Sequence, residues 1–502
     1  MSLLGIDIGS SSCKGVVFNA NGIELARGGQ SYSTVNTGPA MVEMDASLIR
    51  DAVFNVIREL AKKTTDDPIK AFAISSHGET TIPVDKNGKA VGAAIMNSDN
   101  RAIEETEWWE TSFGRERIYS ITGVPLHSMF SLNKIMWLKK NNPELYNKTD
   151  KFLSVGDYIL MQLGLPPYTD FSLACRTMAF DINKHDWSEE ILTHCDIPKQ
   201  KLGIPVASGS VAGKLSKEIA NELGLNEGVI VALGGHDQPC GALGAGAINS
   251  GDVFDSAGTY ECMAAVSAAP MNTPQALTYS LNSYCHVLPG KFVTLAFFPA
   301  GLVSSWFTDQ FCYEEKIIAE QSGKSLFDVL NEKIGVYSPG PTELNITPHF
   351  VGSCNPTWDV RAKGVMAGFT PGTTKYHIYK AIHEGIACEL SINTEVLDEV
   401  VGEFKQMNIA GGNSRSLFTV QLRADLTGKQ INILKNDEAV CLGAAILAGI
   451  AVGVYKDAAD AVSKTVQIEK TVLPDTNAKK QYEKQISRYK VIYPSLAPYR
   501  EI

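Results

Sequence analysis

The sequence lacks the features that mark disulfide-rich, secreted and membrane proteins. Its 502 residues include 10 cysteines, but no C-x-x-C pair, so neither a disulfide framework nor a structural zinc site is expected. No apolar run reaches the roughly 18 residues of a membrane span. The nearest run, residues 441–455, is short and rich in glycine and alanine, which predicts a closely packed buried helix. The N-terminus also lacks the basic region of a signal peptide. These absences favour a cytoplasmic protein with reduced cysteines.

Positive charge is also scarce. The chain has 45 lysines and arginines against 55 aspartates and glutamates, for a net charge of −10, and its basic residues are scattered. A broad cationic surface is therefore excluded, and neither nucleic acid nor a membrane is an expected partner. A chain of this length with 44% hydrophobic residues can bury more than one core, which predicts two or three domains.

The N-terminal region alternates between strand-like and helix-like patterns. Short β-prone runs at 3–8, 14–18 and 23–26 are separated by glycine-containing turns, and another strand is expected at 69–75. Between them, apolar residues recur at three- and four-residue steps from Leu48 to Ala61, which indicates a helix capped by Asp45 or Ser47. This order predicts an α/β layer architecture with a mixed sheet.

A second region, from Gly251, echoes the strand, small-residue turn and strand of the N-terminus. We therefore expect two related α/β halves with a cleft between them, joined by a crossover at 241–250. The predicted domains are 1–247, 248–455 and a helical C-terminal extension at 456–502. The charged part of that extension, around 479–493, is expected to be exposed.

The first candidate site is G-I-D-I-G-S-S-S-C-K, where Asp7 ends a strand and Gly9 to Ser12 form a turn. Backbone N–H groups and hydroxyls in such a turn can hold phosphate oxygens, while the carboxylate holds Mg²⁺. The alternative is a plain strand, turn and strand in which Asp7 only closes the turn. The P-loop pattern G-x-x-x-x-G-K-[ST] is absent.

The second candidate is Asp237, which follows the strand-like run V-I-V-A-L-G-G-H. At a strand's carboxyl end it could accept a proton from a substrate hydroxyl. Alternatively, it is an ordinary helix cap, because Pro239 is typical of a first helical turn. A metal phosphohydrolase using His236 and Asp237 is a third interpretation, but the nine histidines show no spacing for further ligands.

Four further segments could contact a ligand. D-S-A-G-T at 255–259 and A-G-G-N-S at 410–414 are small-residue turns suited to phosphates and a purine. H-G-E-T-T at 77–81 and N-S-D-N-R at 97–101 carry polar side chains that can bind a polyhydroxylated molecule. Each alone is more often a loop, but the combination favours a phosphate and sugar site.

Taken in order, these motifs resemble those of the FGGY family of carbohydrate kinases, within the actin-like ATPase superfamily. The family's first signature is matched by M-F-S-L-N-K-I-M-W-L-K-K-N at 129–141, and its second is approximated from Gly364 to Glu384. The resemblance covers about residues 2–455. It implies an α/β fold of two ribonuclease-H-like domains around a cleft, with the sugar bound mainly by the first domain and ATP with Mg²⁺ mainly by the second.

The resemblance also implies roles for individual residues. Asp237 becomes the catalytic base, and Asp7 and Asp237 the Mg²⁺ partners. The implied ATP-binding residues are Gly9, Ser10, Ser11, Ser12, Lys14, Gly258, Thr259, Gly301, Gly411, Gly412 and Asn413. The implied sugar-binding residues are His77, Glu79, Asp99, Arg101, Asp237 and Gln238. The expected partners are therefore a small sugar and ATP, and a homodimer is left open.

The substrate is less constrained. Glu79 and Gln238 resemble glycerol kinases, but Gly78 stands where those enzymes have an arginine, which argues against glycerol. N-S-D-N-R and T-D-F-S-L-A at 169–174 are closer to the xylulose kinases. The prediction is phosphorylation of a ketopentose such as xylulose, with another ketose or a small polyol of the erythritol or glycerol type as the alternative. A non-catalytic actin-like sugar sensor would need no base.

Overall fold

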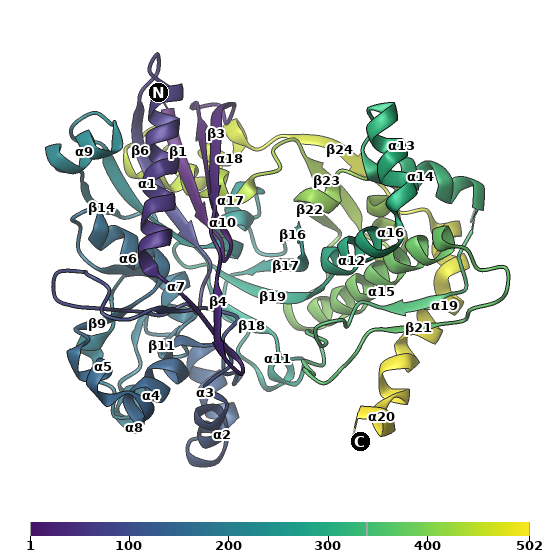
Figure 1. The fold of residues 1–502 in the computed structure, drawn as a ribbon, viewed down its shortest axis with the longest axis horizontal. Helices are drawn as coiled ribbons and strands as arrows, with labels where there is room; N and C mark the ends of the chain where they lie inside the picture. Colours follow the sequence, from purple (N-terminus) through teal and green to yellow (C-terminus); the bar gives the residue numbers. More distant parts are fainter. Residues whose placement is uncertain (1, 338–339, 501–502) are drawn as a thin grey trace.

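The computed structural model of the chain describes residues 2–337 and 340–500. In this part of the chain two mixed sheets form two halves that lie side by side (Figure 1). The strands of the first sheet, in spatial order, are β14 (Val211–Lys214), β15 (Ile230–His236), β6 (Ile69–Ser76), β1 (Ser2–Ile8), β2 (Ser12–Phe18) and β3 (Glu24–Ser31). Those of the second are β18 (Asn282–Cys285), β19 (Phe292–Pro299), β17 (Tyr260–Ser267), β16 (Val253–Ala257), β22 (Gln406–Ala410), β23 (Gln430–Leu434) and β24 (Ile468–Val472).

The two sheets share one topology. In each, the first two strands pair antiparallel, as β1 with β2 and β16 with β17. In each, the first strand also pairs in parallel with a later strand, as β1 with β6 and β16 with β22, and a further parallel strand follows, β15 or β23. The expected pair of related α/β halves is confirmed, and the fold is that of two ribonuclease-H-like domains.

Helices and small strand pairs complete each half. In the first half the helices are α1 (Ala46–Lys63), α2 (Ile103–Ser112), α3 (Arg115–Thr122), α4 (Ser131–Asn141), α5 (Pro143–Lys148), α6 (Val155–Gln162), α7 (Phe171–Cys175), α8 (Glu189–His194), α9 (Lys217–Leu223) and α10 (Asp237–Gly244). Its small strands are β4 (Val35–Gly38), β5 (Met41–Met44), β7 (Ile82–Val84), β8 (Ala94–Ile95), β9 (Lys151–Leu153), β10 (Tyr168–Asp170), β11 (Phe180–Asp181), β12 (Asp186–Trp187) and β13 (Ile204–Val206).

The second half contains α11 (Pro274–Thr278), α12 (Gly301–Phe311), α13 (Tyr313–Ser322), α14 (Leu326–Tyr337), α15 (Lys375–Val401), α16 (Leu417–Thr427), α17 (Ala439–Ala451), α18 (Ala458–Thr465), α19 (Thr476–Ser495) and α20 (Ala497–Arg500), with the small strands β20 (Asn345–Thr347) and β21 (Val365–Ala367). In the described part of the chain, no helix of either half is both long enough and apolar enough to span a bilayer.

Local sequence explains the elements that position the strand ends. The helix expected near Leu48 is α1, and of its two candidate caps Asp45 is the one used, since its side chain accepts a hydrogen bond from the Ser47 N–H. The expected buried helix at 441–455 is α17, whose residues from Ala439 to Gly449 are all buried apart from Val440.

The C-terminal segment differs from the expectation of an exposed tail. Tyr482, Gln485 and Tyr489 of α19 are buried, and their side chains hydrogen-bond Glu384 and Glu389 of α15. β24 also pairs with β23 at the edge of the second sheet. The charged side chains of this helix are exposed as expected, but the sequence did not indicate that Tyr482 and Tyr489 recur on one face, where they pack with Cys388 and Leu426 and hydrogen-bond buried carboxylates.

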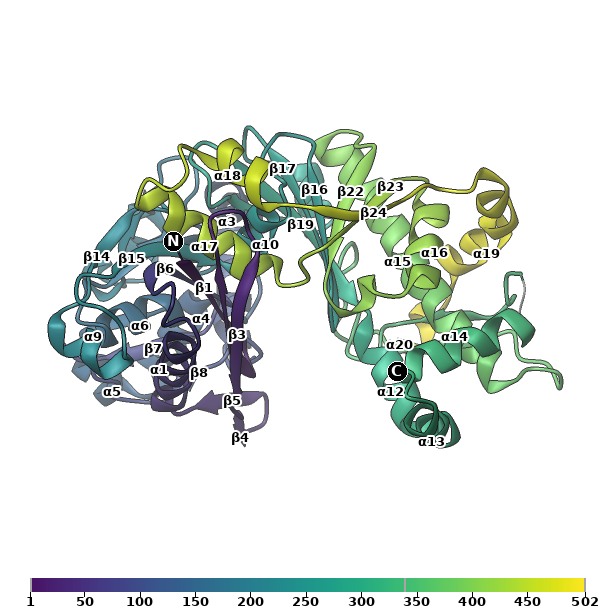
Figure 2. The ribbon, with the colours of Figure 1, turned by 90° about the horizontal axis from the view of Figure 1, so that it is seen from above.

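The two halves are joined by helices in close contact. α17 comes from late in the sequence but lies against β1 and α10 in the first half (Figure 2). A Cβ atom on Gly443 would lie 1.9 Å from the Cys240 carbonyl oxygen, and one on Gly244 would lie 1.8 Å from that of Ala439. On the other face of α17, a Cβ atom on Gly5 of β1 would lie 1.7 Å from the Cys441 carbonyl oxygen. Only glycine permits backbone contacts this close.

We therefore predict that Gly443→Ala separates α10 from α17 and lowers the free energy of unfolding by about 1–3 kcal/mol or more, the usual cost of overpacking. Gly335→Ala is the matched control, because Gly335 lies in α14 with open space around it and alanine favours a helix. Urea denaturation of both variants checks this. Equal stability of the two would show that the close helix contact is not needed.

Candidate functional site

The carboxyl ends of three neighbouring parallel strands meet at one edge of the first sheet. Ile8 of β1 pairs with Ser76 of β6, and Ser76 pairs with His236 of β15. The predicted phosphate turn, the segment 77–81 and Asp237 directly follow these three strand ends. Segments far apart in the sequence are therefore brought together, as expected for ligand sites of α/β sheets.

Asp237 does not cap a helix. His236 is the N-cap of α10, Asp237 is the first helical residue, and no side-chain capping bond is made at this end. Asp237 Oδ1 is buried and makes no hydrogen bond among the described residues, although the side chain as a whole is 26% exposed. This oxygen lies 3.3 Å from His236 Nε2, which would form an ion pair with it only if the imidazole were protonated, and burial lowers the pKa of His236 well below its usual value. Burial, followed by the negative charges of Asp7 and Glu79, raises the pKa of Asp237 to about 7.

The junction before Asp237 is fixed from another segment. Asp170 caps α7 by accepting hydrogen bonds from the N–H groups of Ser172 and Leu173. Ser172 Oγ in turn accepts a hydrogen bond of 2.8 Å from the His236 N–H. The T-D-F-S-L-A segment thus orients the start of α10, which is a positioning contact that the sequence did not reveal.

Asp7 lies at the end of β1, opposite Lys14 on β2. Burial raises the pKa of Asp7 to about 7, although the nearby Lys14 ammonium lowers it. Within the described residues its Oδ1 atom is buried without a hydrogen-bond partner. Lys14 Nζ lies 3.2 Å from Glu438 Oε1, at the N-cap of α17, so this lysine is paired across the two halves.

The first turn is held by backbone hydrogen bonds. The Gly9 N–H donates to the Ser12 carbonyl at 2.9 Å, and the Tyr32 N–H donates to the Ser11 carbonyl at 2.9 Å. Ser10 and Ser11 remain exposed, with Ser12 half-buried. Their hydroxyls are therefore accessible to a ligand at the strand ends.

The predicted ATP-binding residues of the second half form one cluster. The Gly301 N–H donates to the Gly258 carbonyl at 3.2 Å, and Asn413 Nδ2 donates to the same oxygen at 3.0 Å. The Thr259 carbonyl accepts from the N–H groups of Ala300 and Leu302, which ties the turn to the start of α12. A Cβ atom on Gly411 would lie 2.7 Å from the Ala257 carbonyl oxygen. Gly412, the next residue, and Thr259 are both exposed.

The predicted sugar residues divide into two groups. His77, Asp99 and Arg101 are engaged inside the protein. The ring nitrogens of His77 contact the Ile8 carbonyl and Thr80 Oγ1, and Asp99 pairs with Arg101 at 2.7 Å. Arg101 also pairs with Glu43 of β5, and its side chain is 3% exposed. By contrast, Gln238 Oε1 is buried without a partner among the described residues.

Glu79 is held by contacts from the family's first signature. Its backbone has a φ of 61°, a left-handed conformation that is uncommon outside glycine. Its carbonyl accepts hydrogen bonds from Ser131 Oγ at 3.1 Å and from Lys134 Nζ at 3.0 Å. Lys134 is buried and also donates to the Met96 carbonyl at 2.6 Å, so one lysine joins the two polar loops.

The sequence reasoning missed Arg176, which follows α7. Its Nε lies 2.5 Å from Glu79 Oε1, and its Nη1 donates to Asn282 Oδ1 of β18 at 3.0 Å. The argument against glycerol rested on the arginine that is absent at Gly78, but Arg176 supplies a guanidinium beside Glu79 from another segment. The only signal was an arginine two residues beyond T-D-F-S-L-A, in an otherwise apolar run.

The carboxylates fit Mg²⁺ held together with a nucleotide. Mg²⁺ in kinases is bound by one or two carboxylates plus substrate phosphates, and buried oxygens of Asp7 and Asp237 lack partners. In the part of the chain that the structure describes, no group of three or more His, Cys, Asp or Glu side chains could hold a metal alone.

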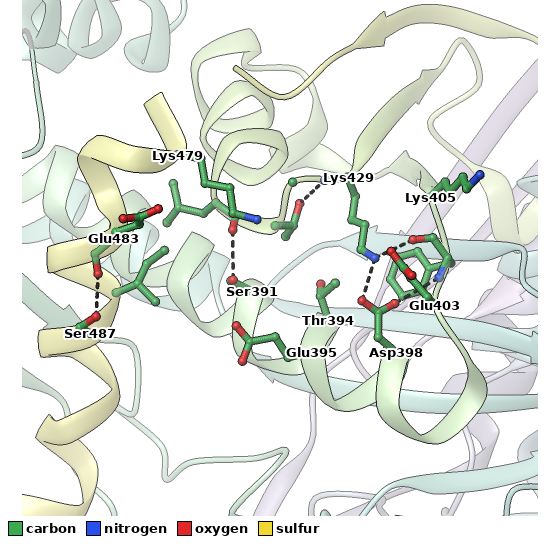
Figure 3. Close-up of a pocket in the computed structure, with 15 residues that line it drawn as sticks. Ser391, Thr394, Glu395, Asp398, Glu403, Lys405, Lys429, Lys479, Glu483 and Ser487 are labelled. Atoms are coloured by element: carbon green, nitrogen blue, oxygen red, sulfur yellow. Dashed lines mark hydrogen bonds and ion pairs between the residues drawn. The ribbon is translucent and has the colours of Figure 1, made fainter. Parts of the chain in front are cut away.

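A separate surface pocket of about 690 Å³ lies on the second half, lined by residues of α15, α16 and α19 and the adjoining loops (Figure 3). Its lining includes Asp398 and Lys429, which pair with each other at 2.7 Å, and none of the predicted site residues. This pocket is therefore distinct from the candidate site.

Known carbohydrate kinases are similar to this chain over nearly its whole length. A xylulose kinase of Staphylococcus epidermidis is 27% identical over 98% of this chain and 96% of its own length. A gluconokinase of Bacillus subtilis is 27% identical over 96% of this chain and 93% of its own. The crystal structure of gluconate kinase from Lactobacillus acidophilus superposes with a TM-score of 0.88 at 25% identity, covering 99% of this chain and 98% of that one. The family models for the N-terminal and C-terminal domains of FGGY carbohydrate kinases match residues 2–244 and 254–452, so the chain belongs to the FGGY family of carbohydrate kinases.

Proposed function

We propose that this FGGY kinase transfers the γ-phosphoryl group of ATP to a hydroxyl of a ketopentose such as xylulose, with Asp237 as the base. The observation that carries the proposal is the carboxylate of Asp237, which caps no helix and has a buried oxygen that accepts no hydrogen bond among the described residues. The similarity to a xylulose kinase and the segments at 97–101 and 169–174 support the ketopentose.

In this mechanism the reacting hydroxyl donates a hydrogen bond to Asp237, which takes the proton as the hydroxyl oxygen attacks the γ-phosphorus. The bond from the γ-phosphorus to the β,γ-bridging oxygen breaks, and ADP leaves. The turns at Gly9–Ser12 and Gly258–Thr259 offer N–H groups and hydroxyls to the phosphates, with Lys14 beside the first turn. Gly301, Gly411, Gly412 and Asn413 bind the nucleoside. Asp7 and Asp237 would hold Mg²⁺, which neutralises phosphate charge when bound. Glu79, Gln238 and the loops organised by His77, Asp99 and Arg101 bind the sugar.

A small polyol is the second candidate, and a specific contact favours it. Arg176 places a guanidinium beside Glu79, so the glutamate and arginine pair expected of a glycerol-type site is present in space. A panel of ketopentoses, ketohexoses, tetritols, glycerol and sugar acids, assayed for acceptor-dependent ADP release, distinguishes the candidates. A ketopentose should give the highest kcat/KM. A higher value for a tetritol or glycerol would replace the ketopentose by a polyol.

Asp237→Asn should lower kcat by roughly 10²–10⁴-fold, the usual contribution of a general base, because the amide keeps the shape but accepts no proton. ATP binding should be nearly unchanged, as measured by calorimetric titration. Turnover close to that of the unmodified enzyme would show that another group is the base.

The pH dependence provides an independent test. Since the pKa of Asp237 is raised, the carboxyl is protonated and inactive as a base on the acidic side, and kcat/KM for the sugar should rise with pH. The midpoint should lie no higher than about 7, because a cation bound beside the carboxylate favours its charged form. The residual activity of Asp237→Asn should lack this rise. An unchanged profile in the variant would assign the titration to another group.

Thr259→Val should raise KM for ATP about tenfold, the effect of losing one hydrogen bond to a charged phosphate. Thr259→Ser is the matched control, because it keeps the hydroxyl and should restore most of the affinity. Steady-state kinetics with each substrate varied in turn checks this. An effect confined to the KM for sugar would place Thr259 in the other half of the site.

A further inference from the structure

Arg176 joins the predicted sugar loop to the second half of the protein. It lies at the C-terminal end of α7, is 4% exposed, and bonds Glu79 on one side and Asn282 of β18 on the other. The rings of Phe130 and Tyr284 lie 5.2 and 5.0 Å from its guanidinium carbon. An arginine held by an ion pair, an amide and two aromatic rings has little freedom to leave this position.

Gly78 provides the space for this side chain. A Cβ atom at position 78 would lie 2.7 Å from Arg176 Cγ and 2.9 Å from its Cβ. Such contacts are closer than side chains adopt, so any larger residue at 78 would displace the arginine. Gly78 and Arg176 therefore act together: the glycine lacks a side chain, and the arginine fills the volume beside Glu79.

The pair retains unused hydrogen-bonding capacity. Arg176 and Glu79 are joined by one hydrogen bond, from Arg176 Nε to Glu79 Oε1. Arg176 Nη2 and Glu79 Oε2 make no hydrogen bond to the described residues. Asn282 Nδ2, next to the guanidinium, is buried without a partner in the same part of the chain. Buried polar groups are normally satisfied, so the unpaired Asn282 Nδ2, beside two further groups that make no hydrogen bond, indicates a polar ligand.

The pair also lies within electrostatic reach of the proposed base. Glu79 raises the pKa of Asp237 and Arg176 lowers it. His236, which precedes the base, hydrogen-bonds Tyr284 Oη at 2.7 Å, and Tyr284 stands over the guanidinium. Arg176 Cγ and His236 Cδ2 both lie close to Gly78, 2.7 and 3.1 Å from the position of a Cβ atom there, so the pair lies beside the segment that carries Asp237. We therefore expect the other oxygens of a ligand at Asp237 to contact the Glu79–Arg176 pair.

We propose that Arg176 is a specificity-determining residue, which with Glu79 forms a donor and acceptor pair for neighbouring oxygens of a neutral sugar or polyol. The inference rests on the proposed phosphorylation at Asp237 and specifies the acceptor class. Neutrality follows from charge: Glu79 already neutralises Arg176, so the pair offers a substrate carboxylate no net positive charge. Such a carboxylate would also lie near Asp7, Glu79 and Asp237, where like charges oppose it.

The test compares Arg176→Met, which keeps the aliphatic stem between the rings, with Arg176→Lys, which keeps the charge. Arg176→Met should raise KM for the best neutral acceptor about 10–100-fold, as expected for a lost hydrogen bond from a charged donor, with a smaller effect on KM for ATP. Arg176→Lys should recover part of this loss. Arg117→Met is the control, because Arg117 makes an exposed ion pair with Glu190 in the same half.

Because Arg176→Met leaves Glu79 unpaired, two further variants separate binding from folding. Arg176→Met/Glu79→Gln removes both charges and should fold while keeping the raised KM for the acceptor. Gly78→Ala changes no charge, yet should raise the same KM because its Cβ displaces Arg176. Thermal denaturation of each variant, with and without the acceptor, reports folding and binding separately.

The acceptor panel provides the remaining outcomes. Higher kcat/KM for a sugar acid than for every neutral sugar or polyol would overturn the inference, as would an unchanged acceptor KM in a folded Arg176→Met/Glu79→Gln protein. If the best acceptor is neutral but is not a ketopentose, and these variants raise its KM as expected, the inference is supported and the proposed ketopentose is contradicted.

Discussion

The structure depends on the close contact between α10 and α17. Glycine at 244 and 443 lets each helix backbone touch the other, and Gly5 lets β1 touch α17 from the other side. α10 begins with Asp237, and the N-cap of α17 is Glu438, the partner of Lys14. One backbone contact therefore sets the position of the candidate base and of the ion pair beside the first phosphate turn. Because no side chain separates these helices, their relative position is fixed more tightly than ordinary side-chain packing allows.

The candidate site contains carboxylates in buried positions, where the charged form is unfavourable. Burial raises the pKa of both Asp7 and Asp237 to about 7, and the pKa of Asp255, on β16 of the second half, is also raised by burial and by the nearby Glu261. All three have buried oxygens without partners among the described residues. Such groups oppose folding, so they are expected where a ligand or a reaction requires them. The duplicated topology accounts for Asp7 and Asp255, since each lies near the end of the first strand of its sheet, before a small-residue turn.

Positioning of the sugar loops depends on residues that need not touch the substrate. Ser131 and Lys134 of the first family signature bind the Glu79 carbonyl, and Lys134 extends to the Met96 carbonyl. Burial lowers the pKa of Lys134 to about 7, and the nearby carboxylates of Glu79 and Asp99 oppose this shift. His77, Asp99 and Arg101 are similarly engaged in internal hydrogen bonds. The signature is therefore explained by the hydrogen bonds that hold a left-handed residue and two loops in place.

The sequence by itself determined the α/β class, the repeated strand and turn pattern, the helix that begins after Asp45 and the family, because these depend on local periodicity and on motifs read in order. It also indicated Asp7, Asp237 and the glycine turns as candidates, since each follows a predicted strand. Only the tertiary structure decided that Asp237 caps no helix, that α19 is packed through Tyr482 and Tyr489, and that Arg176 occupies the space left by Gly78. Those facts depend on contacts between residues about 100 positions apart, such as Glu79 and Arg176, which no local pattern encodes.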